Sequence, residues 1–405
     1  MTPRFKNLID GEWVDSASGK TFTNINPANT QDHIGEFSQS DVQDARRAVA
    51  AARKAYDGWR LTPAPRRAEI LFRVAEALIR QKEQLAQDMT REMGKVLKET
   101  RGDVQEAIDM TYYIAGEGRR LHGHTTPSEL PNKYMMSARV PLGVAAIITP
   151  WNFPMAIPSW KIIPALVTGN TVVFKPSSDA PLSAYNFVKI LHECGIPKGV
   201  INFFTGTGSG VGAELVTNPD VSIISFTGST ETGRTINQAA AASFKRISLE
   251  MGGKNALIIM EDANLDLALD GAVWGGFGTS GQRCTAASRI LLHDAVYDKF
   301  MDRFVARAKS LRVGDGLKVE TEMGPVVNEN QLGKVESYVR IGKEEGAKLL
   351  CGGERVSSGS HASGHFFAPT IFGDVHRNMR IAREEIFGPV VSVIRIKNLE
   401  EAIDI

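Results

Sequence analysis

The sequence has little cysteine, no bias of charge and no long apolar run. Only three of its 405 residues are cysteines, without the spacing of metal-binding pairs, which favours a reducing compartment and at most one functional thiol. The formal net charge is +1, without a block of like charges, so no overall field favours nucleic acid or an anionic membrane. No apolar run could span a bilayer, and the N-terminus lacks the apolar core of a signal peptide. These absences predict a cytoplasmic protein with no nucleic-acid or membrane partner.

The composition that remains is typical of a globular protein with more than one core. Hydrophobic residues make up 42% of the chain and charged residues 23%, both ordinary values. Because 405 residues exceed a single typical core, two domains are expected.

The first third of the chain predicts short strands followed by helices. Residues 8–27 have the pattern of short strands and turns. Ser40, with Gln43 three residues later, fits a capping box and predicts a helix start. Two further helical patterns follow, one with an apolar face from Ile70 to Met89 and one over residues 101–121.

From Gly143 onward, apolar runs alternate with helical segments. The runs are GVAAIIT, NTVVFK, GVINFF and SIISFT, and each precedes a helical pattern. This alternation indicates a parallel sheet covered on both faces, as in doubly wound nucleotide-binding folds. A fifth run, NALIIM, is expected to open a second α/β domain. The preceding stretch, residues 125–139, has two prolines and no helical period, so the residues alone predict an extended connector.

One cysteine lies in a stretch suited to a reactive thiol. The sequence FGTSGQRCTAASR, Phe277–Arg289, surrounds Cys284 with small residues that leave room for a substrate. The alternative from these residues alone is a glycine-rich turn with a buried cysteine. Cys194, at an expected helix end, and Cys351, at an expected strand end, are interpreted as structural.

Two glycine-rich stretches compete as the binding site for cofactor phosphates. GSGVGA, Gly208–Ala213, fits the dinucleotide fingerprint directly after a strand. GSTETG, Gly228–Gly233, fits no such fingerprint, but it too lies between a strand and a helix, where free N–H groups bind anions. Lys175 ends a predicted strand, as ribose-binding groups often do in such sheets.

Six motifs, in order, resemble the aldehyde dehydrogenase superfamily. They are ITPWNF, FKPS, FTGSTETG, LEMGGK, GQRCT and EEIFGPV. The resemblance covers nearly the whole chain, from about Leu8. It implies an α/β fold with two doubly wound Rossmann-like domains and a small β-hairpin oligomerisation arm. The NAD(P)-binding domain would comprise residues 1–122 and 142–252, the first part of the arm residues 123–141, and the catalytic domain residues 253–405.

The resemblance implies an NAD(P)⁺-dependent oxidation of an aldehyde to a carboxylate. Cys284 would form a thiohemiacetal and then a thioester, Asn152 and the backbone N–H of Cys284 would stabilise the oxyanion, and Glu250 would activate water. From the residues alone, Asn152 could equally be a turn residue, and Glu250 a surface carboxylate at the end of a helix or strand. Arg283 could bind a substrate carboxylate or pair elsewhere in the protein.

The resemblance also implies the cofactor site. The phosphates would sit at Ser229 and the helix that starts there, so the GSGVGA match is interpreted as packing near the adenine. Lys175 and Glu385 would hold the two riboses, with Phe387 against the nicotinamide ribose. The expected cofactor-binding residues are Thr149, Pro150, Trp151, Lys175, Ser177, Ser178, Gly208, Gly212, Phe226, Gly228, Ser229, Gly233, Gly252, Glu385 and Phe387. No metal site is expected.

Ser178 bears on the choice between NAD and NADP. Strongly NAD-preferring relatives often carry an acid three residues after the lysine of FKPS, where it binds ribose hydroxyls and repels a 2′-phosphate. A serine does neither, so NADP is expected to be accepted at least as well as NAD.

The C-terminal end departs from the family pattern. The chain stops at NLEEAIDI, where family members continue for several elements, so we expect a C-terminally truncated chain with an incomplete catalytic domain. Full-length relatives are homodimers or homotetramers. The Arg283-Cys284-Thr285 triplet and the stretch GEGRR…PSELPN resemble bacterial semialdehyde-oxidising members. The resemblance therefore implies a small aldehyde substrate, such as succinate semialdehyde or 2-oxoglutarate semialdehyde. Two alternatives remain open: a catalytically weak or non-catalytic truncated member, and a CoA-acylating enzyme, although such enzymes usually lack a glutamate at the position of Glu250.

Overall fold

The computed structural model describes residues 2–405 and divides the chain into two compact units. Unit 1 comprises the residues up to Asn24, Gly35–Asp88 and Arg101–Glu250, and unit 2 comprises Ile25–Ile34, Met89–Thr100 and Met251–Ile405. Two short segments from early in the sequence therefore belong to unit 2, which no pattern in the sequence indicated. The assignment of cofactor binding and catalysis to separate domains stays a prediction.

Unit 1 is built on a mixed sheet with the strand order β12-β11-β8-β9-β10-β2-β3. The strands are β2 (Asn7–Ile9), β3 (Glu12–Val14), β8 (Val144–Ile148), β9 (Thr171–Lys175), β10 (Ile201–Phe203), β11 (Val221–Gly228) and β12 (Arg246–Met251). The neighbours β11, β8, β9 and β10 pair in parallel, which confirms the sheet predicted from the apolar runs. Strands β2 and β3 extend this sheet in antiparallel fashion, and β1 (Arg4–Phe5), β4 (Thr21–Asn26) and β5 (Asn29–Ser38) form a separate sheet.

Helices cover both faces of this sheet. The helices from Val42 to Ala241 are α1 (Val42–Leu61), α2 (Ala64–Met93), α3 (Leu97–Glu117), α4 (Ala156–Val167), α5 (Pro181–Glu193), α6 (Ala213–Thr217) and α7 (Thr230–Ala241). Helices α1, α6 and α7 share one apolar core with alternate strand residues such as Val144, Ala146 and Val173. Helices α4 and α5 contact the same strands from the other side, where Tyr185 of α5 packs on Phe203 of β10. The sheet is therefore covered on both faces, as expected for a doubly wound fold.

The first helix begins one residue later than the sequence predicts. Its N-cap is Asp41, whose side chain accepts hydrogen bonds from the backbone N–H groups of Gln43 and Asp44. The carboxylate of Asp44 in turn accepts from the Asp41 N–H, so the capping box is Asp41/Asp44 and the predicted Ser40/Gln43 box is wrong. The side chain of Ser40 is engaged elsewhere, because its Oγ accepts a hydrogen bond of 2.8 Å from Asn7 Nδ2.

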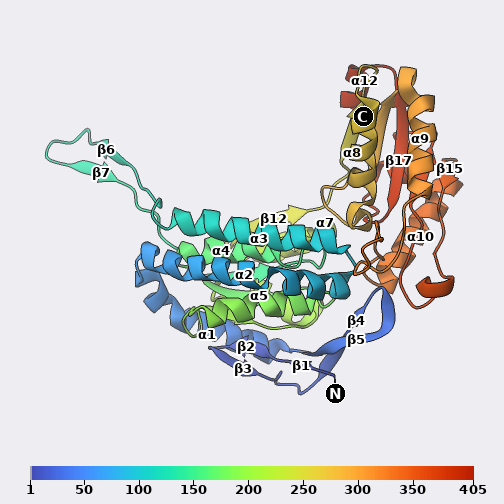
Figure 1. Ribbon diagram of the computed structural model, residues 1–405. Helices are drawn as coiled ribbons and strands as arrows, with labels where there is room; N and C mark the ends of the chain where they lie inside the picture. The colour runs from blue at the N-terminus through green and yellow to red at the C-terminus, as the bar shows by residue number, and fades with distance from the viewer. Residues whose placement is uncertain (1) are drawn as a thin grey trace. The chain divides into compact units, whose positions relative to one another are not determined.

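A two-stranded hairpin projects from unit 1 (Figure 1). Strand β6 (Thr125–Pro127) pairs with β7 (Tyr134–Met136) in antiparallel register. This confirms the hairpin that the resemblance implied and refines the extended connector expected from the residues alone. Tyr134, Met135 and Met136 are all exposed, so the hairpin presents apolar side chains to its surroundings.

Unit 2 contains a sheet with the strand order β13-β14-β17-β16-β15. The strands are β13 (Ala256–Ile259), β14 (Arg289–His293), β15 (Lys348–Cys351), β16 (Thr370–Gly373) and β17 (Val390–Ile396), and the helices are α8 (Leu265–Phe277), α9 (Tyr297–Lys309), α10 (Glu329–Glu344), α11 (Arg380–Arg383) and α12 (Leu399–Asp404). All neighbours pair in parallel except β15, which is antiparallel to β16. Ile290 and Leu292 of β14 face α8 and α9, whereas Leu291 faces α10 and α11. The prediction that NALIIM opens a second α/β domain is therefore confirmed.

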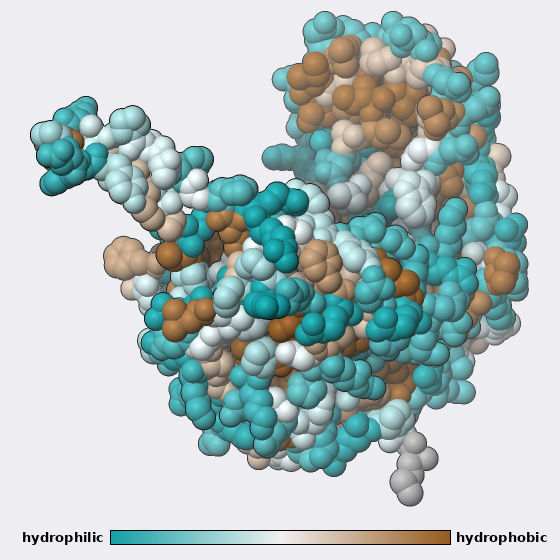
Figure 2. All heavy atoms as spheres, turned by 60° about the vertical axis from the view of Figure 1, so that its left-hand side comes forward, coloured by the Kyte–Doolittle hydropathy of each residue, from teal (hydrophilic) through white to brown (hydrophobic). Residues whose placement is uncertain are grey.

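One face of unit 2 exposes a group of apolar side chains. Leu267 and Trp274 on α8 and Ile258 on β13 are all exposed, and the space-filling view shows an apolar area on this unit (Figure 2). Strand β13 is also the first strand of its sheet, so it presents an open edge. An apolar area of this kind can be covered by another segment or chain.

Candidate functional site

Cys284 follows a strained loop that begins at the end of α8. Thr279 and Ser280 adopt the left-handed backbone conformation, with φ angles of 53° and 54°. For residues other than glycine such a conformation costs about 1–2 kcal/mol each, and it persists only where the surroundings enforce it. Gly281, with φ of 68°, continues the turn, and a Cβ there would lie 2.1 Å from the carbonyl oxygen of Gly388. Only glycine fits this position.

Buried polar side chains hold the loop in place. Ser280 Oγ donates a hydrogen bond of 2.7 Å to the Gly324 carbonyl. The side chain of Gln282 makes two hydrogen bonds. Its Nε2 donates to the Thr279 carbonyl at 3.2 Å, and its Oε1 accepts from the Val327 N–H at 3.0 Å. These bonds fix the backbone that precedes Cys284.

The thiol of Cys284 is exposed, whereas the other two cysteines are not. Its backbone carbonyl accepts a hydrogen bond of 2.6 Å from Asn255 Nδ2. Cys351, at the end of β15, and Cys194, at the end of α5, are buried and partly buried, and burial raises the pKa of both thiols. The interpretation of GQRCT as a turn with a buried cysteine is therefore wrong, and of the three thiols Cys284 has the best access to a substrate.

Arg283 turns back into unit 2. Its Nη2 donates hydrogen bonds to the carbonyls of Trp274 and Gly275 near the end of α8, and its guanidinium lies 4.5 Å from the centroid of a Trp274 ring. A cation is favourable at the C-terminal end of a helix. Of the two interpretations left open by the sequence, these contacts favour an arginine that pairs within the protein.

Glu385 lies beside the glycines of LEMGGK in unit 2. A Cβ on Gly252 would lie 2.0 Å from Glu385 Oε2, so the carboxylate requires glycine there. Burial raises the pKa of Glu385, while the charges of Lys334 and Lys254 and a hydrogen bond from the Gly253 backbone lower it. The sequence analysis missed Lys334. Only its proximity to Glu385 identifies it, because the two residues are far apart in the sequence.

Phe387 has a positive φ of 60°. The carbonyls of Ile386 and Phe387 accept hydrogen bonds of 3.1 and 2.8 Å from Gln331 Nε2 on α10. This side chain holds the EEIFGP turn in its conformation.

Unit 1 contains a cavity of about 440 Å³ bordered by strands β8, β9 and β11 and helices α6 and α7. Four of the expected cofactor-binding residues line it: Lys175, Gly208, Gly212 and Phe226. Residues that the sequence analysis did not identify also line it, namely Ile148, Ser209, Ala213, Val216, Thr217, Glu231, Thr232, Thr235, Ile236 and Ala239. Both glycine-rich stretches therefore contribute to one cavity.

Lys175 is buried at the end of β9, so it is not a solvated surface lysine. Its Nζ donates a hydrogen bond of 2.8 Å to the Pro176 carbonyl. Burial lowers the pKa of Lys175 to about 8, although the charge of Asp179 opposes this shift. A Cβ on Gly212 would lie 3.8 Å from Cδ of the lysine, so Gly212 lies against the lysine stem.

Ser229 is the N-cap of α7. Its Oγ accepts a hydrogen bond of 3.2 Å from the Thr232 N–H, and its carbonyl accepts one of 2.9 Å from the Gly233 N–H. Thr232 lines the same cavity as Lys175, so a helix start and a buried amine border one space. Because both favour an anion and the remaining wall includes apolar side chains, the cavity fits the phosphates and the base of a nucleotide.

The remaining expected residues follow the strands at the same edge of the sheet. After β8, Thr149 and Asn152 are buried, and the Thr149 N–H donates to the Lys175 carbonyl at 3.2 Å. Pro150 and Trp151, between them, are partly buried. After β9, Ser177 Oγ donates to Asp179 Oδ2 at 3.1 Å, and Ser178 Oγ donates to the Gly206 carbonyl at 3.4 Å. Gly228 ends β11, where a Cβ would lie 2.5 Å from the Phe226 ring.

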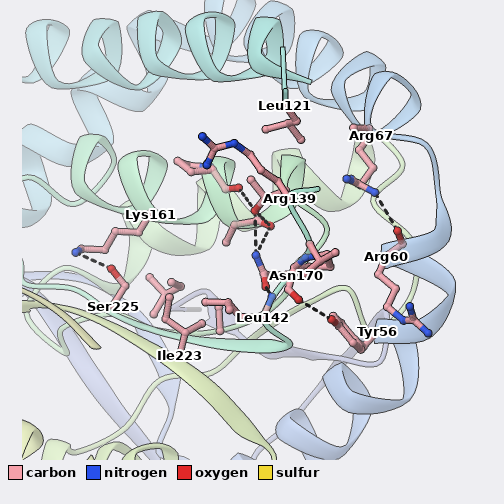
Figure 3. Close-up of a pocket in the computed structure, with 18 of the residues that line it drawn as sticks. Tyr56, Arg60, Arg67, Leu121, Arg139, Leu142, Lys161, Asn170, Ile223 and Ser225 are labelled. Carbon is pink, nitrogen blue, oxygen red and sulfur yellow. Dashed lines mark hydrogen bonds between the residues drawn. The ribbon is translucent and has the colours of Figure 1, made fainter. Parts of the chain in front are cut away.

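Glu250 is exposed near the end of β12. This placement matches the alternative interpretation of Glu250 as a surface carboxylate at the end of a strand. The negative charge of Glu250 acts on Lys161 of α4 and raises the pKa of this lysine. Lys161 Nζ donates to Ser225 Oγ at 3.0 Å (Figure 3). It also donates to the Phe226 carbonyl at 3.3 Å. The lysine and Ser225 line a second cavity in unit 1, of about 990 Å³. The sequence analysis did not identify Lys161, because the pattern of α4 marks it only as a polar position.

Replacing Lys161 by methionine should change how stability depends on pH. Burial lowers the pKa of Lys161 to about 8 from its usual value of 10.5, and Glu250 only partly offsets this. Between these pH values the folded state binds fewer protons than the unfolded state, so this lysine makes the wild type more stable as pH rises. Denaturant unfolding at pH 8 to 10 should therefore show the wild type gaining stability relative to Lys161→Met. Lys54→Met, at an exposed position, is the control. Parallel curves for wild type and Lys161→Met would contradict the assignment.

Asn152 and Glu250 belong to unit 1, and Cys284 belongs to unit 2. Their joint role in one reaction therefore stays a prediction.

Within residues 2–405, no helix is long and apolar enough to cross a membrane, and no group of three or more His, Cys, Asp or Glu residues could hold a metal ion.

A cavity that fits a nucleotide in one α/β unit, and an exposed thiol on a loop held by buried hydrogen bonds in the other, are features of nucleotide-dependent enzymes. The model of the aldehyde dehydrogenase family matches residues 13–405. The chain belongs to this family.

Its relatives include several aldehyde dehydrogenases. The chain is 42% identical over 401 residues to alpha-ketoglutaric semialdehyde dehydrogenase of Bacillus subtilis (strain 168), covering 99% of this chain and 82% of that protein. It is 43% identical over 403 residues to alpha-ketoglutarate semialdehyde dehydrogenase of Haloferax volcanii, covering 100% of this chain and 83% of the relative. Among solved structures, betaine aldehyde dehydrogenase of Staphylococcus aureus in complex with NAD⁺ superimposes with a TM-score of 0.97 at 39% identity, covering 98% of this chain and 80% of that chain.

Proposed function

We propose that this protein oxidises a small semialdehyde to the corresponding carboxylate, with NAD⁺ or NADP⁺ as the oxidant. The observation that carries the proposal is the exposed Cys284 thiol on a loop fixed by buried hydrogen bonds. A thiol with free access and a fixed backbone is suited to nucleophilic attack on a carbonyl carbon. The two relatives that act on alpha-ketoglutarate semialdehyde support a substrate with a carboxylate at its far end.

In the proposed reaction, the Cys284 thiolate adds to the aldehyde carbon and forms a thiohemiacetal. The negative charge on the former carbonyl oxygen is stabilised by two donors, the side-chain amide of Asn152 and the backbone N–H of Cys284. Oxidation of this adduct by two electrons leaves a thioester. Glu250 then removes a proton from a water molecule, whose oxygen adds to the thioester and releases the carboxylate and the thiolate.

Two groups of residues are suited to holding the cofactor. Lys175 and the start of α7 at Ser229 have the charge and the free N–H groups for its phosphates and adjacent ribose. Glu385, with Lys334 beside it, is suited to binding the hydroxyls of the second ribose. Bound there, the cofactor would supply the acceptor for the hydride that the thiohemiacetal carbon loses. The NAD⁺ bound by the Staphylococcus aureus relative supports this assignment.

The substrate proposal is tested by following NAD(P)H absorbance with a panel of aldehydes. We expect 2-oxoglutarate semialdehyde and succinate semialdehyde to give higher kcat/KM than betaine aldehyde or an uncharged aldehyde of the same length. A clear preference for the uncharged aldehyde would overturn the semialdehyde assignment while leaving the dehydrogenase chemistry intact.

We also propose that the β6–β7 hairpin takes part in assembly into a homodimer or homotetramer. Its exposed apolar side chains, Tyr134, Met135 and Met136, are suited to burial against another subunit. Light scattering of the wild type and of a variant with these residues changed to serine would test this. An unchanged mass in the variant would contradict it.

Ser178 should permit the use of NADP. Ser178→Glu would place a carboxylate where a 2′-phosphate is expected, and like charges brought together cost several kcal/mol in binding. We therefore expect kcat/KM for NADP to fall about 10²-fold, and kcat/KM for NAD to change much less.

The matched control is Ser178→Ala, which removes the hydroxyl without adding charge and should leave the ratio of the two cofactors near that of the wild type. A wild-type protein that uses only NAD would contradict the assignment.

A further inference from the structure

A carboxylate from a distant part of the sequence contacts the loop that precedes Cys284. Glu99 lies in the first turn of α3, in the short segment Met89–Thr100 that belongs to unit 2. Its Oε1 accepts a hydrogen bond of 2.7 Å from the backbone N–H of Thr279. Glu99 takes no part in the reaction proposed above, so this contact needs a separate explanation.

The bond lies at the point where the loop becomes strained. Helix α8 ends at Phe277, and Thr279 is the first of two non-glycine residues in the left-handed conformation. A β-branched residue is especially unfavourable there, so the conformation requires external support. Ser280 and Gln282 supply part of it through the bonds described above. The backbone N–H of Thr279 donates to Glu99, and the backbone carbonyl of Thr279 accepts a hydrogen bond from Gln282.

Two cationic side chains also act on the carboxyl group of Glu99. Burial raises the pKa of Glu99, and the charges of Lys95 and Arg283 oppose that shift. Arg283 is the residue directly before Cys284, and its guanidinium is itself held at the end of α8. Glu99 thus interacts with the loop at two positions, through a hydrogen bond from Thr279 and through electrostatic attraction to Arg283.

We propose that Glu99 is a positioning residue for the nucleophile: its carboxylate holds the Thr279 N–H, and through it the strained turn that presents Cys284. It does not touch the substrate. The kinetic part of this inference rests on the proposed function, whereas the structural part concerns only the conformation of residues 277–285.

The test compares Glu99→Ala with Glu99→Gln. Alanine removes the acceptor, whereas the side-chain oxygen of glutamine can still accept from the Thr279 N–H. Lys98→Ala, at the exposed neighbouring position, is the control for a substitution in the same turn of α3. The measurements are hydrogen exchange of the peptide covering residues 277–285, cofactor affinity, and kcat and KM for the aldehyde.

We expect Glu99→Ala to increase exchange in this peptide about tenfold and to lower kcat about 10²-fold, since small misplacement of a reacting group has effects of this size. Cofactor affinity and exchange in the strands of unit 2 should stay near wild type. Glu99→Gln should restore most of the protection and most of kcat, and Lys98→Ala should change neither.

Several results would overturn the proposal. One is wild-type protection of residues 277–285 in Glu99→Ala, and another is lost protection with unchanged kcat. Equal losses in Glu99→Ala and Glu99→Gln, or exchange raised throughout unit 2, would assign Glu99 a general role in folding instead. If the wild type itself oxidises no aldehyde, the proposed function fails, and the exchange comparison alone decides whether Glu99 holds the loop.

Discussion

Replacing Cys284 with alanine is expected to abolish aldehyde oxidation. In the proposed reaction both covalent intermediates form on this sulfur, so no other group can carry the oxidation. Deleting the nucleophile of an enzyme that acts through a covalent intermediate can cost about 10⁶-fold in kcat, which would leave no measurable turnover. The measurement is steady-state production of NAD(P)H, together with mass spectrometry of the protein to detect an acyl adduct on the sulfur.

The matched controls are Cys194→Ser and Cys351→Ser. Cys194 ends α5 and Cys351 lies at the end of β15, where its Sγ is 3.6 Å from the Pro369 carbonyl oxygen. Both variants should keep turnover near that of the wild type, although Cys351→Ser places a hydroxyl in a buried position and should lower stability. Cofactor titration confirms that Cys284→Ala is folded. Near-native turnover in a folded Cys284→Ala would refute the covalent mechanism.

Substitutions of Asn152 and Glu250 should slow different steps of the reaction, an early step for Asn152 and a late step for Glu250. Asn152 is buried after β8, and Asn152→Ala removes an amide donor without adding bulk. Loss of one oxyanion donor typically costs about 10²–10³-fold in rate, so the first turnover should be slow in this variant. Glu250→Gln keeps the shape of the exposed side chain but cannot accept a proton from water. It should show a normal first turnover followed by slow release of the acid.

Rapid mixing with a semialdehyde distinguishes these steps. Glu250→Gln should give a burst of reduced cofactor equal to the concentration of active sites and should accumulate a thioester, whereas Asn152→Ala should give neither. The absence of both burst and thioester in Glu250→Gln would mean that Glu250 acts earlier, on the thiol itself.

Local patterns in the sequence predicted the parallel strands of the first sheet and the first strand of the second. The apolar runs GVAAIIT and NTVVFK contain the buried parallel strands β8 and β9, because a strand covered on both faces must be apolar throughout. The helix start at Ser40 was wrong by one residue, because a tertiary hydrogen bond from Asn7 engages the serine. Capping patterns compete with such long-range contacts, and a sequence alone does not show which one is formed.

The candidate site was predictable where its residues lie within short motifs. The thiol loop around Cys284 and the two glycine-rich stretches were found from local sequence, and the structure brings both stretches to one cavity with Lys175. Lys161, Lys334 and Glu99 were not found. Each lies in an ordinary helical pattern, and each gains its significance only from a neighbour far away in the sequence.

The sequence by itself determined the family, the alternation of strands and helices over residues 143–242, and the identity of the candidate nucleophile, because spacing and residue type carry this information locally. The tertiary structure decided which thiol is exposed, which backbone carbonyls Arg283 binds, and which carboxylate supports the strained turn at Thr279. These features depend on burial and on hydrogen bonds between residues such as Glu99 and Thr279, 180 positions apart, and only the folded chain brings such groups within bonding distance.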